Sequence, residues 1–339
     1  MGRRDKKYSK SLHTQAYEKL ESMICFGKSK RLAKLNGEDT TSLIFSINTY
    51  KTYKQQVNQF IDYLNEHHSD VTTLDAAKKY IKEYLISRED KGDSAWTIQT
   101  AAKALGKLYG ITPSSPEYYD PPKRHRKDII RSRLDTVGDE HFSESNNQDL
   151  IKFCKATGLR RDELSHLKND CLYTKAELVD ELVGYAKNNY NVNTKQAIRI
   201  NLIKDAKLFD EEYFIYAVGK GGRPRFVPVL KKYENFVIER IKDTKDGVKI
   251  FEHINTHADI HSYRGEYATA IYKKYARKIE DIPYDKIRGG INQKYQSEVY
   301  CARKDEKGKR LDKKAMLLAS KALGHNRIEV VATNYIRGI

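Results

Sequence analysis

The chain has 339 residues, a formal net charge of +17 at pH 7 and a pI near 9.4. This length fits two domains better than one or three. Because 46 Asp and Glu residues accompany the 63 Lys and Arg residues, the excess charge must lie in local basic clusters. Such clusters favour a polyanionic partner over the alternative, a merely soluble basic protein.

The composition argues against a membrane-spanning protein and against a secreted, disulfide-rich one. No apolar run approaches the ~18 residues that a membrane span needs, and the basic start "MGRRDKKYSK" lacks the apolar segment of a signal peptide. The four cysteines form no Cys-x-x-Cys pair; they are Cys25, Cys154, Cys171 and Cys301. We therefore expect a cytoplasmic protein with reduced thiols, without a membrane partner, a disulfide framework or a zinc knuckle.

The first third of the chain is predicted to be a helical domain over residues 1–112. Residues 1–35 carry ten Lys or Arg against three acidic residues, and "HTQAYEKLESMICF" within them is compatible with one amphipathic helix. This basic start is either an arm that meets phosphates or a solvated tail. Apolar residues spaced by three and four predict three further helices, within residues 46–65, 73–85 and 94–110.

Residues 113–134 are predicted to be a basic linker between two domains. They contain four of the seven prolines, which disfavour regular secondary structure. A basic run follows the last of these prolines and consists of Lys123, Arg124, Arg126 and Lys127. Because each phosphate contact displaces condensed counterions, we expect these four side chains to bind DNA.

The remainder, 135–339, is predicted to be mostly helical with one small antiparallel sheet. An apolar helix lies near 149–158, and a polar, Lys- and Asn-rich stretch occupies 173–196. The segment "YFIYAVGKGGRPRFVPVL" places two β-rich runs on either side of a Gly-rich turn, which predicts a hairpin with Lys220 at its tip. A further helix is expected from about Tyr263. The fold class is thus mainly α with a small antiparallel sheet.

Several short motifs follow one another in this second part. They are Thr-Gly-Leu-Arg ending at Arg160, with Glu163 three residues later, the Gly-Lys-Gly hairpin tip, His-x-x-Arg, Leu-Gly-His and a C-terminal Tyr. Each is weak alone, but their order resembles the tyrosine recombinase (phage integrase) family. The similarity covers residues from about 135 to the end, and the N-terminal helices match the family's core-binding domain in kind only. The resemblance implies a catalytic C-terminal domain and a clamp on duplex DNA.

The resemblance also implies the catalytic residues, which are Arg160, Lys220, His261, Arg264, His325 and Tyr335. In this chemistry Tyr335 attacks a DNA phosphodiester and forms a covalent 3′-phosphotyrosine, while two arginines stabilise the charge on phosphorus. A histidine accepts the phenol proton, the hairpin lysine protonates the leaving 5′ oxygen, and the second histidine holds the phosphate. Neither a cofactor nor a metal is expected. Beside the hairpin tip, Arg223 and Arg225 are predicted to bind DNA.

Three alternatives to these roles concern individual residues or motifs. His253, His257 and His261 recur at a spacing of four and could bind a metal from one helix face, but Asn255, Thr256 and Asp259 disfavour a helix there. The turn "GKGGR" lacks the pattern of a phosphate-binding nucleotide loop. Arg161 takes the role of Arg160 only if the motif is shifted by one; otherwise it is a charge on the helix surface.

The sequence departs from the simplest members of the family in three kinds of feature: two insertions, one spacing between motifs, and the length of the tail. The segments from Arg160 to Lys220 and from Arg264 to His325 are long, His325 and Tyr335 are ten residues apart, and only four residues follow Tyr335. The second insertion is either a contact surface for DNA or a neighbouring protomer, or a surface excursion. Many family members carry a further C-terminal helix that docks on the neighbouring subunit.

The predicted function is therefore that of a site-specific DNA recombinase, the integrase of a mobile element or prophage. Its expected partners are double-stranded DNA, further copies of the same chain in a tetramer on DNA, and an accessory directionality factor. The short tail keeps a second hypothesis open, in which the fold serves a DNA-binding regulator such as a repressor. Retention of all six catalytic residue types argues against that alternative.

Overall fold

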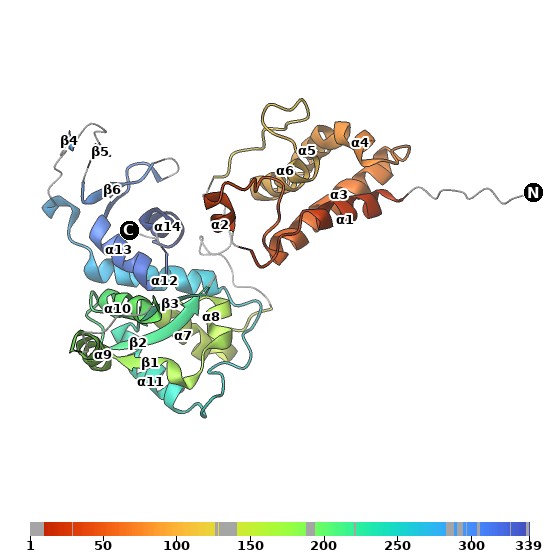
Figure 1. Cartoon of the computed structure of the whole chain (residues 1–339). Helices are drawn as coiled ribbons and strands as arrows, with labels where there is room; N and C mark the ends of the chain where they lie inside the picture. Colours follow the sequence, from red (N-terminus) through yellow and green to blue (C-terminus); the bar gives the residue numbers. More distant parts are fainter. Residues whose placement is uncertain are drawn as a thin grey trace, which may run out of the picture. The chain divides into compact units, whose positions relative to one another are not determined.

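The computed structural model divides the chain into two compact units, Met1–His125 and Arg126–Ile339 (Figure 1). None of the described helices is long and apolar enough to cross a membrane. The described residues are 10–28, 30–125, 128, 141–187, 194–219, 222–282, 288–289, 294–295, 297–303, 306–325, 327–336 and 339.

The N-terminal unit is helical, as predicted. Its helices pack around a core that includes the fully buried Phe60, Ile61 and Leu105. The segment predicted as one helix over 73–85 is interrupted by a 3₁₀ turn at Lys78–Tyr80, which nevertheless keeps its apolar residues on the core side. The helices are α1 (Leu12–Ser22), α2 (Lys30–Leu35), α3 (Ile47–His67), α4 (Leu74–Ala77), α5 (Ile81–Asp90) and α6 (Ala95–Tyr109).

The Pro-rich segment differs from the predicted linker, because it packs on the N-terminal unit instead of leaving it at residue 113. Tyr119 packs against the core of this unit and donates a hydrogen bond to Glu89. Farther along, the amide of Gln99 donates to the Pro122 carbonyl at 2.8 Å, and the Arg124 guanidinium lies 5.7 Å from the centre of the Trp96 ring. These aromatic and polar anchors extend the unit to residue 125.

The described residues of the C-terminal unit form mainly helices, which confirms the predicted fold class, and three small antiparallel sheets where one was predicted. Its sheets are the three-stranded β1 (Leu172–Thr174), β2 (Tyr213–Gly219) and β3 (Arg223–Pro228), in that order, and the pairs β4 (Arg288–Gly289) with β5 (Lys294–Tyr295) and β6 (Val299–Cys301) with β7 (Arg310–Asp312). Its helices are α7 (Gln148–Thr157), α8 (Arg161–His166), α9 (Lys175–Lys187), α10 (Thr194–Ala206), α11 (Glu234–Lys242), α12 (Ile260–Tyr275), α13 (Lys313–Ala322) and α14 (Ile328–Asn334).

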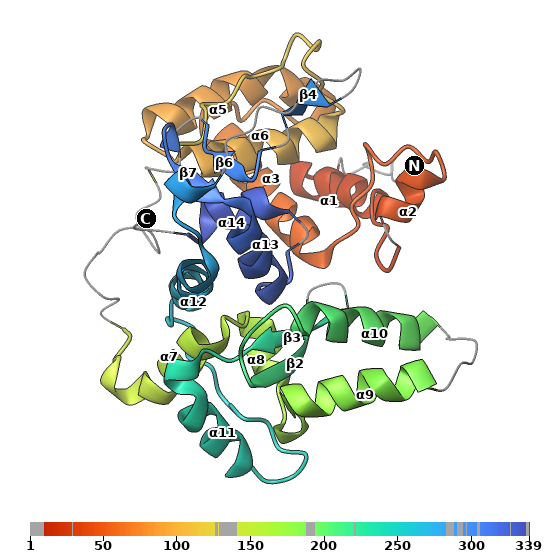
Figure 2. The same ribbon diagram turned by 90° about the vertical axis from the view of Figure 1, so that its left-hand side faces the viewer.

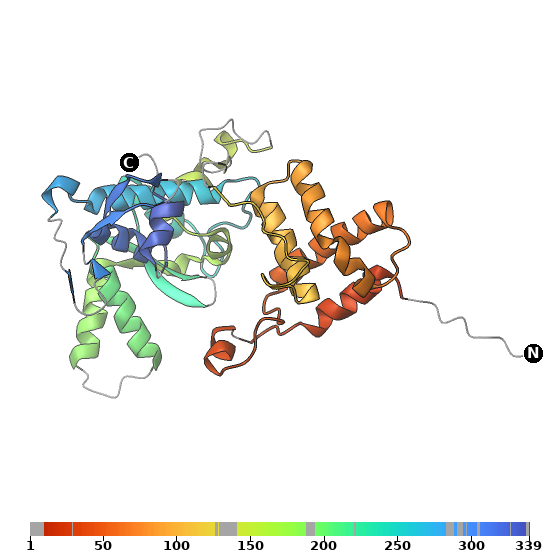
Figure 3. The same cartoon turned by 90° about the horizontal axis from the view of Figure 1, so that it is seen from above.

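The predicted hairpin is present as β2 and β3, with Val218 opposite Pro224. The polar stretch over 173–196 differs from the sequence interpretation, because it contains most of β1, the helix α9 and the start of α10. These two helices lie side by side and extend away from the sheet (Figures 2 and 3). Arg199 on α10 holds them: its guanidinium donates to both carboxylate oxygens of Glu181 at 2.9 and 2.8 Å and stacks on Phe226 of β3.

Two glycines that end helices with positive φ provide a matched pair for a stability prediction. Gly110 ends α6 with φ 66°, and a Cβ added there would meet no atom within 4 Å. Gly158 ends α7 with φ 57°, and its Cβ would lie 2.2 Å from Cδ1 of the fully buried Tyr267. We expect Gly110→Ala to cost about 1 kcal/mol for the left-handed backbone alone. Gly158→Ala should cost about 3 kcal/mol, because the tyrosine ring must also move.

Urea unfolding of each variant measures the two losses. The single Trp, Trp96, reports on the N-terminal unit by fluorescence, and circular dichroism reports on the helices of both units. Equal losses of unfolding free energy in the two variants would mean that the contact with Tyr267 does not constrain the backbone at Gly158.

Candidate active site

Arg160 is positioned by the turn between α7 and α8. Gly158 ends α7 in the left-handed conformation, Leu159 is buried, and Arg160 is the extended residue that precedes α8. Glu163, one turn into α8, accepts hydrogen bonds from the backbone N–H of Arg160 and from its Nη1, both at 2.7 Å. The carboxylate therefore both caps the helix and orients the arginine.

Arg225 requires a correction, because it does not lie on the surface as a DNA-binding residue would. Its side chain is 8% exposed, and its Nη1 and Nη2 donate to the two oxygens of Glu163 at 2.7 and 2.8 Å. Its Nε donates to the Ala322 carbonyl at 3.1 Å. Since these groups already bind protein acceptors, Arg225 connects β3, α8 and the end of α13.

Glu163 is a buried carboxylate shared by several arginines. Burial by itself would raise the pKa of Glu163, but the hydrogen bonds and charge of Arg225, the backbone N–H of Arg160 and the charge of Arg264 lower it to about 2. Glu163 is therefore ionised at neutral pH. The three guanidiniums around one carboxylate leave an excess of positive charge.

Arg264 lies on α12, four residues into the helix, and only 2% of its surface is exposed. Its Nη1 donates to the Gly158 carbonyl and its Nη2 to the Leu323 carbonyl, while its Nε lies 3.5 Å from the Tyr335 hydroxyl. Burial, together with the charges of Arg160 and Arg225, lowers the pKa of Arg264 to about 10, so the guanidinium remains charged at neutral pH.

Tyr335 follows the last residue of α14 and points its ring toward the same group of residues. It is 7% exposed. Its ring centre lies 5.0 Å from that of His261 and 5.2 Å from that of His325. Its backbone is held by the Thr269 hydroxyl, which donates to the Tyr335 carbonyl at 3.2 Å. The candidate nucleophile is thus in the site of its own chain.

An open pocket of about 390 Å³ lies at this convergence. It is lined by Arg160, Arg161, Thr256, Ala258, Asp259, Ile260, His261, Arg264 and Tyr335. Four of the six predicted catalytic residues therefore line this pocket. His325 does not line it, but its ring contacts the ring of Tyr335. Lys220 lies outside the described residues. Gly219, the residue before it, abuts the site, because a Cβ there would lie 3.3 Å from Arg160 Nη1.

The other predicted DNA-binding residues are dispersed. Lys123 is exposed in the N-terminal unit and Arg223 is exposed at the start of β3, whereas Arg124 is half-buried against Trp96. Arg126 and Lys127 lie outside the described residues. The described part of the chain contains no group of three or more His, Cys, Asp or Glu side chains placed to hold a metal ion. His253, His257 and His261 therefore do not form the three-histidine metal site that the alternative requires.

His325 is held at its backbone but has an unused ring nitrogen. Its N–H donates to the Ser320 carbonyl at 2.8 Å, and the Ser320 hydroxyl donates to the His325 carbonyl at 2.9 Å. Its Nε2 is buried without a hydrogen-bond partner. Burial, followed by the charges of Arg264, Arg160 and Arg225, lowers the pKa of His325 to about 4. The ring is therefore neutral at pH 7 and can donate one hydrogen bond.

Binding of an oxyanion in this pocket should be visible in the titration of His325. A phosphate offsets the neighbouring guanidinium charges, so we expect inorganic phosphate to raise the pKa of His325 from about 4 by roughly one pH unit. NMR titration of ¹⁵N-labelled histidine measures the midpoint, with sodium chloride at equal ionic strength as the control. The same midpoint in both salts would show that the pocket binds no phosphate.

Comparisons with known proteins give a distant structural likeness. No family model and no curated protein matches the sequence. The chain is similar at 15% identity to the XerH site-specific recombinase in a post-cleavage complex with palindromic difH substrate, over 97% of this chain and 91% of that one, with a TM-score of 0.47. The XerH pre-cleavage complex with difH (15% identity, 95% and 91% covered, TM-score 0.45) and the XerA recombinase (15%, 95% and 94%, TM-score 0.25) are also similar. At this identity and these TM-scores the likeness assigns no function by itself.

Proposed function

We propose that this chain is a tyrosine-type site-specific DNA recombinase, the integrase of a mobile element or prophage. The observation that carries the proposal is the position of the Tyr335 hydroxyl, 3.5 Å from Nε of Arg264, in a pocket that Arg160 and His261 also line. A nucleophile and two guanidiniums suited to a phosphate thus share one space. A DNA-binding regulator has no need of a hydroxyl at that place.

The charge around the pocket supports a phosphodiester as the group that is bound. Arg160, Arg225 and Arg264 surround one carboxylate, that of Glu163. Partly buried positive charge without its full complement of carboxylates favours an anion, and guanidiniums bind phosphate oxygens in forked pairs. The pocket is open enough to admit a backbone phosphate of DNA.

The reaction we propose begins with attack of Tyr335 Oη on the scissile phosphorus. A bond forms between that oxygen and phosphorus, the bond from phosphorus to the 5′ oxygen breaks, and a 3′-phosphotyrosine remains. Arg160 and Arg264 stabilise the charge that develops on the non-bridging oxygens. His261 accepts the phenol proton, and Lys220 protonates the departing 5′ oxygen.

The second half of the reaction reverses these steps with a different strand. A 5′ hydroxyl from the partner duplex attacks phosphorus and releases the tyrosine, so the energy of the phosphodiester is conserved and no ATP is consumed. His325, neutral at pH 7, donates its hydrogen bond to the phosphate. Exchange between two duplexes requires four such cleavages, and we therefore propose a tetramer on DNA, directed by an accessory factor.

A covalent trap tests this function on duplexes that the chain itself selects. Duplexes that bind the full chain are isolated from a random-sequence pool and resynthesised with a nick near the candidate cleavage position. Cleavage then releases a short fragment that carries the new 5′ hydroxyl. Because this fragment diffuses away, the covalent intermediate cannot be religated. We expect a protein–DNA adduct on a denaturing gel, with mass spectrometry placing the nucleotide remnant on Tyr335. Tight binding without an adduct at any nick position would favour the DNA-binding regulator.

A further inference from the structure

We propose that Arg161 is a positioning residue for the reaction, which makes this inference dependent on the proposed function. Its role is to hold residues 254–258 in place, and thereby to set where α12 begins. That helix carries His261 and Arg264. The sequence interpretation left Arg161 as a charge on a helix surface, whereas its side chain is directed to a distant segment of the chain.

Among the described residues, the hydrogen bonds of Arg161 go to backbone carbonyls of that one segment. Its Nη1 donates to Asn255 at 2.6 Å and to Ile254 at 3.3 Å. Its Nη2 donates to Ala258 at 2.8 Å and to Thr256 at 3.3 Å. A planar guanidinium can reach four acceptors in this way, whereas the ammonium group of a lysine is a single point of charge.

The held segment leads directly into the catalytic helix. Ala258 is followed by Asp259, whose Oδ1 accepts a hydrogen bond from the Ser262 N–H at 3.0 Å and so caps α12. His261 is the second residue of the helix, and Arg264 lies one turn farther on. A displacement of the segment therefore displaces both catalytic side chains, and misplacement by about 1 Å can slow a reaction by about 100-fold.

The place of Arg161 in the chain gives this contact its significance. Arg161 is the first residue of α8 and directly follows Arg160. The start of one helix therefore supplies the first catalytic arginine and also fixes the start of the helix that supplies the second. This arrangement links the positions of the two phosphate-binding guanidiniums through the starts of their helices, in addition to the contacts that Arg264 makes with the Gly158 and Leu323 carbonyls.

Arg161 could instead act through its charge alone, since it also lines the pocket. Within the described part of the chain no carboxylate forms an ion pair with Arg161, and carbonyl dipoles offset its charge only partly. Its side chain therefore adds positive charge to the pocket. Replacement by lysine separates the two roles, because lysine keeps the charge but cannot reproduce four hydrogen bonds.

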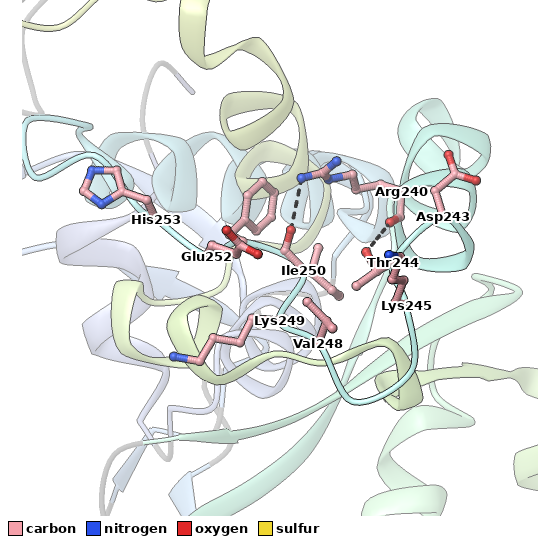
Figure 4. A pocket seen from close by; sticks show the side chains of 10 residues that line it. Arg240, Asp243, Thr244, Lys245, Val248, Lys249, Ile250, Glu252 and His253 are labelled. Carbon is pink, nitrogen blue, oxygen red and sulfur yellow. Dashed lines mark hydrogen bonds between the residues drawn. The ribbon is translucent and has the colours of Figure 1, made fainter.

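Arg240 offers a matched control in the residues just before the held segment. Its Nη2 donates to the Ile250 carbonyl at 3.1 Å, and its guanidinium lies 5.3 Å from the centre of the Phe251 ring. It lines a different pocket, of about 400 Å³, together with residues 243–245 and 248–253 (Figure 4). Arg240→Lys is the same chemical change. It affects a side chain that contacts the same loop at residues 250 and 251, outside the candidate active site.

The experiment compares the wild-type chain with Arg161→Lys, Arg161→Gln and Arg240→Lys. Single-turnover adduct formation is measured on the selected nicked duplex, DNA affinity by gel shift, and hydrogen exchange on the peptide covering 254–264. We expect both Arg161 variants to slow adduct formation by about 100-fold and to raise exchange in that peptide. Arg161→Lys should change DNA affinity by less than about 3-fold, because the charge is kept, and Arg240→Lys should leave the rate within about 3-fold of wild type.

Three outcomes would overturn the proposal. If Arg161→Lys reacts at the wild-type rate while Arg161→Gln is slow, charge and not geometry is required. If Arg240→Lys loses as much activity as Arg161→Lys, the effect is a general loss of packing. If exchange in 254–264 is unchanged in Arg161→Lys, the segment is not held by this residue. A wild-type chain that forms no adduct would refute the proposed function, while the exchange comparison would still decide whether Arg161 holds the segment.

Discussion

Replacing Tyr335 with Phe should abolish the covalent protein–DNA adduct and leave the fold nearly unchanged. Phenylalanine keeps the ring contacts with His261 and His325, whose centres lie 5.0 and 5.2 Å away. It loses only the hydroxyl, and with it a long contact of 3.5 Å to Arg264. We therefore expect a stability change below about 1 kcal/mol and DNA affinity within about 3-fold of wild type, because the basic side chains that bind phosphates remain.

Tyr263→Phe is the matched control for this experiment. Tyr263 is 7% exposed, as Tyr335 is, and lies in the same unit, but it does not line the pocket. The control should form adduct at close to the wild-type rate on the selected nicked duplex. An adduct that persists in Tyr335→Phe would assign the nucleophile to another residue. Loss of adduct in both variants would point to damage to the fold.

Replacing Glu163 with Gln should lower the free energy of unfolding of the C-terminal unit by about 3 kcal/mol at pH 7. The carboxylate is almost fully buried, with its side chain 1% exposed, and it accepts hydrogen bonds from Arg160 and Arg225. Without its charge, buried guanidiniums are left without their common partner. Asp162→Asn is the control: it is the same chemical change on a side chain that is 80% exposed, and its cost should be below about 0.5 kcal/mol.

The pH dependence of this loss identifies its origin. The pKa of Glu163 is lowered from its ordinary value of 4.5 to about 2 in the folded chain. Its stabilisation is therefore complete above pH 4.5 and is lost as the pH falls toward 2. Urea unfolding across this range should show the wild type and Glu163→Gln converging as the pH falls. A difference that stays constant with pH would attribute the loss to packing and not to charge.

The sequence alone determined much of the secondary structure and the identity of the candidate site. The spacing of apolar residues predicted α3 and α6, and Gly110 marked the end of α6, because helix periodicity and capping depend on neighbours within a few residues. The β2–β3 hairpin was predicted from its turn in the same way. The order of the short motifs singled out residues of which Arg160, His261, Arg264 and Tyr335 line one pocket.

Predictions made from neighbouring residues were wrong where a segment is stabilised by contacts with residues far away in the sequence. The prolines after residue 112 indicated a linker, but Tyr119 packs against the core of the N-terminal unit and extends that unit to residue 125. The polar stretch over 173–196 was not predicted to be helical, yet α9 forms within it and α10 begins at its end. An ion pair between Arg199 and Glu181, and stacking of the arginine on the sheet, stabilise the two helices.

Only the tertiary structure decided what each arginine does. Arg223 and Arg225 are two residues apart on one strand, yet the first is exposed and the second is buried against Glu163, 62 residues away in sequence. Arg160 and Arg161 are adjacent, yet the second donates to carbonyls 93 to 97 residues away. The role of a charged side chain depends on which acceptors the fold brings within hydrogen-bond distance. Acceptors so far away in sequence leave no periodic or turn signal near the residue itself.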